Sequence, residues 1–479
     1  MTIDLTPILP ALVVAVTGVL VLLAQAFGPK GKPALCAPLA IAGLVAALSF
    51  VIRTLAGIGR GSVLAGAVAA DDFALFLEIL ILGIAILSVL IAPGYLRSAG
   101  IERGEYYALL LFSVVGMLGL VSSLELISLF VALEIMSVAL YAMAGMRRGR
   151  VESQEAALKY FITGAFASAF FLYGVALLYG VSGSTSLARI AGVLGTGAGG
   201  RPMVVLAAGL LLVGFGFKVG GVPFHMWTPD VYEGAPTTVT AFMAAGVKAA
   251  AFGAFLRVFF GALSSAAHDW QPALAGLAAM TIVVGNLGAL AQTNLKRMLA
   301  FSSIAHTGYL LAAFVALPDA AASSVLFYLV GYAAVNLGSF GVLAALAKDG
   351  KEPATLADLA GLAQRSPTLA AALTVFLISL MGVPVSAGFV GKFYLFSAAV
   401  STGYVSLAIL GVVMSVVSAY YYLRVVVTMY MNEPGGEDIW AEIPWGARIA
   451  LGVAVLVTLG LGVYPLPVLD LARLAAASL

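Results

Sequence analysis

Long runs of apolar residues recur along the whole chain and alternate with short polar segments. Fourteen runs are long enough to cross a hydrocarbon core of about 30 Å, and they lie at approximately 8–27, 34–55, 74–93, 105–121, 124–145, 157–181, 202–226, 237–262, 272–291, 298–316, 322–346, 367–399, 402–431 and 446–466. The longest connections, roughly 183–201 and 347–366, are too short to hold a soluble domain. The pattern therefore predicts an all-α polytopic membrane protein with about fourteen transmembrane helices.

Composition supports this prediction and narrows the chemistry. The 479 residues are 62% hydrophobic and 10% charged, whereas soluble domains have about 45–50% and 25%. The single cysteine, Cys36, excludes a disulfide framework, a thiolate-ligated iron–sulfur cluster and a cysteine zinc site in this chain. With only three histidines, we expect no metal and no cofactor in this chain. The formal net charge of +2 gives no indication of nucleic-acid binding.

The basic residues of the connecting loops are distributed unequally between the two sides of the membrane. Thirteen lie in the odd-numbered loops: Lys30, Lys32, Arg97, Arg103, Arg147, Arg148, Arg150, Lys296, Arg297, Lys348, Lys351, Arg365 and Arg448. Five lie on the side of the two termini: Arg53, Arg60, Arg189, Arg201 and Arg473. Because cytoplasmic loops carry the excess of Lys and Arg, we expect both termini on the side away from the cytoplasm.

Several charges lie inside the predicted spans. Glu134 lies deep in the fifth span, and six basic residues are embedded elsewhere: Lys159, Lys218, Lys248, Arg257, Lys392 and Arg424. A charge at the bilayer centre costs about 2.5–3.5 kcal/mol even on a lenient insertion scale. Such residues persist only where they face protein or water and find partners, so they are the first candidates for function.

Glu134 and Lys218 form the pair that we expect to act as a switch. Pairing with the carboxylate keeps the ammonium of Lys218 protonated, and separation frees its proton. A neutral Glu134 that is hydrogen-bonded to a neighbouring helix is the structural alternative. Lys248 lies among small residues that leave room for water, and Lys392 follows a Gly-rich break. Both are predicted to continue the proton relay.

Three further residues are accessory candidates. His225 can shuttle protons near physiological pH, or it can bond backbone that a helix break frees. Lys159 lies near the start of its span, where its ammonium can instead snorkel to the headgroups. His306 can bridge relay groups together with the serines that precede it.

The remaining embedded charges have simpler interpretations. Arg257 and Arg424 stay protonated, so they can bias a proton path but not carry protons. We expect them to pair with carbonyls or lipid phosphates. Glu78 lies near a span end and is expected to face the headgroups.

Two similar breaks suggest an internal repeat. Gly221-Val222-Pro223 closes the seventh span and Gly382-Val383-Pro384 interrupts the twelfth, 161 residues later. Proline removes a helix hydrogen bond, and paired broken helices indicate an inverted-repeat transporter. The two breaks are five spans apart, and an odd number of spans inverts the second copy relative to the first.

Three stretches resemble a known family. Residues 217–237 read FKVGGVPFHMWTPDVYEGAPT, residues 294–309 read NLKRMLAFSSIAHTGY, and residues 382–393 read GVPVSAGFVGKF. Together they resemble the antiporter-like subunits of respiratory complex I. The WTPDVY-x-GAP form and the lysine at 392 are similar to the N-type subunit, the equivalent of mitochondrial subunit 2, more than to the L or M types.

The resemblance implies two inverted five-helix repeats with helices 7 and 12 broken. The corresponding boundaries are 1–100 for the first three helices, 101–265 and 266–435 for the repeats, and 436–479 for the last helix. The family's relay positions fall on Glu134, Lys218, Lys248 and Lys392, with Lys159 and His225 as accessory positions. The resemblance also implies a bacterial cytoplasmic (inner) membrane, with both termini periplasmic.

The implied function is proton translocation within NADH:quinone oxidoreductase, driven by quinone reduction in other subunits. Quinone, FMN and iron–sulfur clusters are expected in those partner subunits, subunits M and K are expected neighbours, and membrane lipids surround the chain. A subunit of a multi-subunit cation/proton antiporter or of a membrane-bound hydrogenase is the alternative. A quinone-binding redox subunit is a third hypothesis, disfavoured by the lack of metal ligands and of a clear headgroup pocket.

Overall fold

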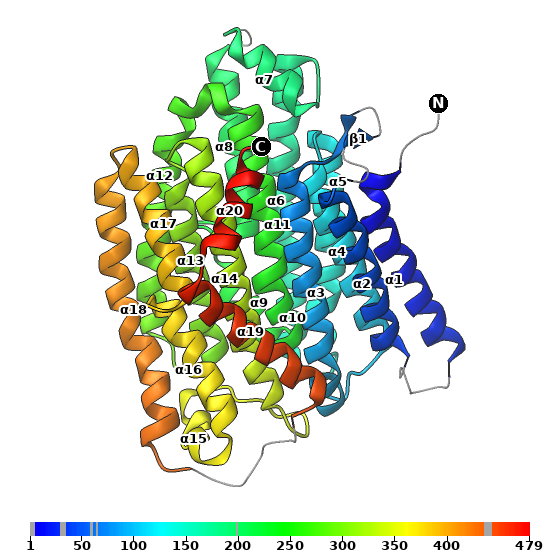
Figure 1. Ribbon diagram of the computed structural model, residues 1–479, viewed down its shortest axis with the longest axis vertical. Coiled ribbons are helices and arrows are strands. Elements are labelled where there is room, and N and C mark those ends of the chain that lie inside the picture. Colours follow the sequence, from blue (N-terminus) through cyan, green and yellow to red (C-terminus); the bar gives the residue numbers. More distant parts are fainter. Residues whose placement is uncertain (1–4, 29–34, 58–60, 64–65, 198–199, 435–442) are drawn as a thin grey trace.

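The computed structural model describes residues 5–28, 35–57, 61–63, 66–197, 200–434 and 443–479. Helices packed side by side along the long axis make up most of the molecule (Figure 1). Three residues used in the loop-charge comparison, Lys30, Lys32 and Arg60, lie outside the described residues.

The elements follow one another in a single series. The α-helices are α1 (Leu9–Phe27), α2 (Cys36–Leu55), α3 (Asp72–Ser98), α4 (Gly104–Ser122), α5 (Leu126–Ala144), α6 (Val151–Ser182), α7 (Leu187–Gly195), α8 (Arg201–Val219), α9 (Trp227–Gly234), α10 (Thr237–Phe242), α11 (Lys248–Leu256), α12 (Ala267–Leu290), α13 (Leu295–Ala313), α14 (Pro318–Ala345), α15 (Leu362–Arg365), α16 (Pro367–Met381), α17 (Ala387–Ser401), α18 (Val405–Met431), α19 (Trp445–Val463) and α20 (Leu466–Ala476). Short 3-10 turns are η1 (Thr6–Ile8), η5 (Ser264–Ala266) and η6 (Leu356–Leu359), and π-helical segments are η3 (Met243–Val247) and η4 (Arg257–Ala262). One antiparallel hairpin pairs β1 (Gly61–Val63) with β2 (Val68–Ala70).

The predicted crossings are confirmed. Within the described residues, twelve helices are long and apolar enough to cross a membrane. The more polar α13, which is not one of these twelve helices, packs along α12. The consecutive short helices α16 and α17 together form one more crossing. The hairpin and the short helices α7 and α20 were not predicted, because they are too short for a hydropathy pattern to reveal.

The prediction that helices 7 and 12 are broken is also confirmed. Helix α8 ends at Val219 and is followed by Gly220 (φ 74°), and α9 starts only after a segment that contains a cis Val222–Pro223 bond. Helix α16 ends at Gly382 (φ 91°), five residues before α17 starts. Glycine adopts this left-handed backbone without the steric cost of a Cβ, so both breaks are encoded locally.

The first and the last described residues of the chain lie at the same end of the bundle. The backbone N–H of Phe73, at the start of α3, donates to Ser478 Oγ (2.9 Å), and η1 packs against the β1–β2 hairpin. The start of α1 and the end of α20 accordingly both lie in the upper part of Figure 1. This arrangement agrees with an even number of crossings, and it leaves the side of the membrane as a prediction.

The crossing made of α10, η3, α11 and η4 is the most enclosed part of the bundle. Its apolar window is 100% buried and that of α14 is 94% buried, against 33% for α1, α2 and α19. Lys248 therefore lies on the helix that has the least access to lipid.

Gly388, at the second break, provides a test of this fold. A Cβ there would lie 1.8 Å from the backbone oxygen of Ser379. Gly388→Ala should destabilise the protein by about 1–3 kcal/mol, because overpacking forces the backbone to move. Thermal unfolding of the purified complex measures this, with Gly452→Ala as the control because a Cβ at Gly452 meets nothing within 4 Å. Equal melting of Gly388→Ala and the wild type would contradict the close approach.

Candidate functional site

Three buried lysines on three different crossings define the candidate site. Lys218 on α8, Lys248 on α11 and Lys392 on α17 are 4%, 4% and 5% exposed. None of the three makes an ion pair with a carboxylate within the described part of the chain. Their ammonium groups are instead solvated by hydroxyls, carbonyls and aromatic rings.

Lys218 binds a hydroxyl of α5. Its Nζ donates to Ser137 Oγ at 2.6 Å. The ammonium also lies 5.5 Å and 5.7 Å from the ring centroids of Tyr141 and Tyr160. An aromatic face attracts a cation, so these rings add to the solvation of the buried charge.

Glu134 is half-buried on α5 and does not contact Lys218 directly. Its Oε1 accepts a hydrogen bond from Ser168 Oγ of α6 at 2.5 Å. No ion pair between Glu134 and Lys218 occurs among the described residues, so this conformation corresponds to the separated state of the expected switch, and the paired state stays a prediction. Ser137 lies three residues further along the same helix face and accepts from the lysine instead.

Lys248 is held by α13 and α14. Its Nζ donates to the carbonyl oxygen and Oγ of Ser303 at 2.7 and 2.6 Å, and to the Tyr332 hydroxyl at 3.2 Å. Tyr332 in turn donates to Ser303 Oγ at 2.8 Å. The lysine lies between the π-helical segments η3 and η4. Such segments are rare and often mark functional sites.

His306 on α13 connects two phenols. Its Nδ1 is hydrogen-bonded to the Tyr328 hydroxyl, and its Nε2 lies 3.2 Å from the Tyr422 hydroxyl. Tyr422 also shares a hydrogen bond with Ser302. His306 therefore bridges two tyrosine hydroxyls, and its expected role in joining the relay groups stays a prediction.

Lys392 caps the first half of the broken helix. Its Nζ donates to the carbonyls of Leu380 and Met381 at 2.8 and 3.1 Å, and to Ser415 Oγ at 2.6 Å. These are the last carbonyls of α16, which have no partner within their own helix. The negative end of the half-helix dipole also favours a cation there. The break and the lysine therefore depend on each other.

Two small cavities lie in the gaps between these groups. One of about 10 Å³ is lined by Lys218 and Lys248 together with Trp227 and Thr228. Another of about 10 Å³ is lined by His306, Tyr332 and Leu380. Each volume corresponds to the space that the centre of about one water molecule needs. Groups that are not directly bonded can therefore be joined through single waters.

Lys159 and His225 lie apart from these buried contacts. Lys159 is half-exposed and binds Asp230 and Glu155 at 2.6 and 2.7 Å. Asp230 also binds Arg297 at 2.7 Å. His225 is half-buried, and its Nδ1 has no hydrogen-bond partner among the described residues.

A buried ionic cluster at one end of the bundle was not predicted from the sequence. Glu352, in the segment between α14 and α16, binds Arg147 (2.6 Å), the hydroxyl of Thr237 and the Tyr95 hydroxyl (3.3 Å). Burial opposes ionisation of Glu352, but Lys296, Thr237 and Arg147 together hold its pKa below the usual value. The cluster connects the start of α10 to the end of α5.

The other embedded charges have specific protein partners. Arg257 forms a bidentate ion pair with Asp71 (2.8 Å for both bonds) and donates to the Val121 carbonyl at 3.2 Å. Arg424 donates to the Gln292 carbonyl at 2.5 Å. The predicted carbonyl contacts are confirmed, and the acidic partner of Arg257 was missed. Glu78 is 4% exposed, so the prediction that it faces headgroups is wrong.

Within the described residues, no group of three or more His, Cys, Asp or Glu side chains could hold a metal ion.

The chain is similar to several known proteins. Residues 123–418 match the family described as NADH:quinone oxidoreductase/Mrp antiporter, transmembrane. NADH-quinone oxidoreductase subunit N of Trichlorobacter lovleyi is 44% identical over 99% of this chain and 97% of its own length. The corresponding subunit of Chloroflexus aggregans is 45% identical over 98% of this chain and 96% of its own length.

Solved structures show the same fold. A chain of respiratory complex I from Thermus thermophilus with bound aureothin is 38% identical, with a TM-score of 0.82 over 97% of this chain and 100% of that chain. A chain of the Mrp complex from Dietzia is 23% identical, with a TM-score of 0.88 over 100% of this chain and 97% of that chain. The second likeness concerns the fold alone.

Glu352→Gln tests the ionic cluster. The pKa of Glu352 is lower in the folded protein than in the unfolded chain, so its ionised carboxylate stabilises the folded state at pH values above the unfolded-state pKa. This stabilisation is lost as the pH falls through the pKa of the folded state. The variant should lose about 2 kcal/mol at pH 7, and the deficit should shrink below about pH 4.5. Thermal unfolding across pH measures this, with the exposed Glu105→Gln as the control. A deficit that does not depend on pH would contradict an ionised Glu352.

Proposed function

The chain belongs to the NADH:quinone oxidoreductase/Mrp antiporter family as an N-type proton-translocating membrane subunit of respiratory complex I, and we propose that Glu134, Lys218, Lys248 and Lys392 carry its protons. Redox chemistry takes place in other subunits of the complex. The proposal therefore concerns how this chain moves protons.

The proposal rests on one observation, the series of polar contacts and cavities that lies between the buried groups. Ser137 joins Lys218 to the helix of Glu134, and the first cavity lies between Lys218 and Lys248. Ser303 and Tyr332 lead from Lys248 toward His306, and the second cavity leads on to Leu380, which binds Lys392. Protons move along hydrogen bonds, so this order is the proposed path.

The switch operates by exchanging the partner of Lys218. Ser137 and Glu134 are three residues apart on α5, about 4.5 Å along the helix axis. A Lys218 that moves from the hydroxyl to the carboxylate exchanges a neutral partner for a charged one. At 4 Å and an effective dielectric constant of 20, that difference is about 4 kcal/mol, which equals several pKa units. Such a movement is sufficient to retain or release a proton.

The chain organisation proposed with this path has two inverted repeats at 101–265 and 266–435, preceded by residues 1–100 and followed by residues 436–479. Matching glycine breaks after α8 and α16 support it.

Lys159 and His225 are proposed to act as accessory groups where the path opens. The Asp230 contact of Lys159 keeps that lysine at the rim of the bundle.

The proposed surroundings follow from the family. The chain lies in a bacterial cytoplasmic membrane with both termini periplasmic, beside subunits M and K, while FMN, iron–sulfur clusters and quinone are bound by partner subunits. Full-length identity of 44–45% to subunit N favours this over a cation/proton antiporter or hydrogenase arm. Co-purification separates the options. Co-purified flavin and iron–sulfur subunits would support complex I, and small antiporter subunits would support a cation/proton antiporter. Photolabelling of this chain by a quinone analogue would support a redox role.

Lys218→Met and Glu134→Gln test the relay. Each keeps the approximate size of the side chain and removes its charge. The rate of proton translocation should fall about tenfold, which corresponds to a barrier increase of about 1.4 kcal/mol. Proton uptake into liposomes that contain the purified complex measures this, with subunit content as the assembly readout. The exposed Lys351→Met serves as the control. A wild-type rate in both fully assembled variants would refute the relay.

A further inference from the structure

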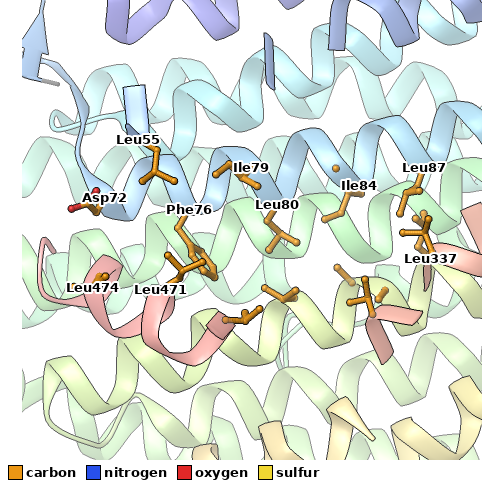
Figure 2. Close-up of a pocket in the computed structure, with 17 residues that line it drawn as sticks. Leu55, Asp72, Phe76, Ile79, Leu80, Ile84, Leu87, Leu337, Leu471 and Leu474 are labelled. Atoms are coloured by element: carbon orange, nitrogen blue, oxygen red, sulfur yellow. The ribbon is translucent and has the colours of Figure 1, made fainter. Parts of the chain in front are cut away.

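A long apolar groove lies on the side of the bundle where α3, α14, α19 and α20 meet. Its cavity volume is about 460 Å³, and Figure 2 shows its lining side chains arranged along α3. Of the seventeen lining residues, only Asp72 is polar. The groove takes no part in the proton path described above.

Small residues create the hollow. Gly83 lies midway along the α3 wall, and a Cβ added there would meet nothing within 4 Å. Ala333 and Ala334 form the facing wall on α14. Buried glycines elsewhere permit close helix contact, as at Gly285, where a Cβ would lie 2.4 Å from the backbone of Ala305. At Gly83 the missing side chain instead leaves space for something else.

The dimensions of the groove suit a single extended chain. It runs from Asp72 to Leu87 along α3, and fifteen residues of α-helix rise about 22 Å. Asp72 is the first residue of α3 and Leu55 is the last of α2, so this end lies at the membrane surface. The opposite end, near Leu87 and Val453, lies within the span.

We propose that this groove binds one acyl chain of a membrane phospholipid, with the headgroup at the Asp72 end. A transmembrane helix of a partner does not fit inside the groove, because the empty space of the groove, about 1,300 Å³, is less than the roughly 1,700 Å³ that a helix about 10 Å wide and 22 Å long occupies. Among the described residues that line the groove, a polar small molecule finds no polar side chain below the mouth. A quinone headgroup accepts hydrogen bonds, and a carboxylate offers it no donor, whereas the ammonium of a phosphatidylethanolamine headgroup donates to a carboxylate such as Asp72. An acyl chain needs only apolar surface.

The bound chain fills space next to the relay. Val330, Ala333, Ala334 and Leu337 line the groove from α14, and Tyr332 of the same helix binds Lys248. An acyl chain would thus complete the packing of α14 against α3 and α19.

Gly83→Phe tests the site by filling the groove. The complex is purified, placed in phosphatidylethanolamine vesicles that contain a diazirine-labelled acyl chain, washed with detergent, irradiated and mapped by peptide mass spectrometry. Wild-type labelling should concentrate on the groove residues of α3 and α14 and exceed labelling of exposed α18. Gly83→Phe should reduce the groove labelling about tenfold, because several methylenes can no longer be buried. Gly83→Leu, a smaller substitution, should give a partial reduction.

The control and the contrary outcomes are specific. Gly209→Phe places the same side chain at an exposed position of α8, where a Cβ also meets nothing within 4 Å, and should leave groove labelling unchanged. Three outcomes would overturn the proposal: groove labelling no stronger than on α18, equal labelling in Gly83→Phe and wild type, or labelling of the groove only by a diazirine on an isoprenoid quinone tail.

Discussion

The free-energy cost of burying a charge away from water governs the architecture of this protein. Three ammonium groups survive at membrane depth because protein oxygens replace the lost hydration. Ser137 supplies one for Lys218, and Ser303 supplies two for Lys248. Lys392 takes two carbonyls that only an interrupted helix can expose. The second break and the buried hydroxyls therefore solvate charges as well as shaping the fold.

The two ends of the bundle differ from its middle in the kind of partner that each charge has. At one end Arg147 binds Glu352, and at the other Arg257 binds Asp71 in a bidentate pair. These full ion pairs tie helices together. In the middle, the lysines have neutral partners, so their charge is opposed by burial and supported only by dipoles. Groups held in this way respond to a change of charge nearby, which a relay requires.

Much of this arrangement could be predicted from the sequence, because the strongest signals are local. Hydropathy revealed the crossings, two Gly-Val-Pro sequences revealed the breaks, and the cost of burial singled out Lys218, Lys248 and Lys392. The phenols of Tyr328, Tyr332 and Tyr422 were missed, since tyrosines in apolar spans resemble ordinary packing residues until α13, α14 and α18 are brought together. Ser137 in place of Glu134, and the burial of Glu78, likewise depend on tertiary packing that periodicity does not contain.

The central claim is that the buried groups form one hydrated path. A map of the assembled complex that resolves ordered water tests it most directly. The account predicts a water in the cavity between Lys218 and Lys248, and another in the cavity beside His306 and Leu380, each hydrogen-bonded to groups on both sides. Well-resolved density that shows both cavities dry, or closed by apolar side chains in every conformation of the working complex, would contradict it.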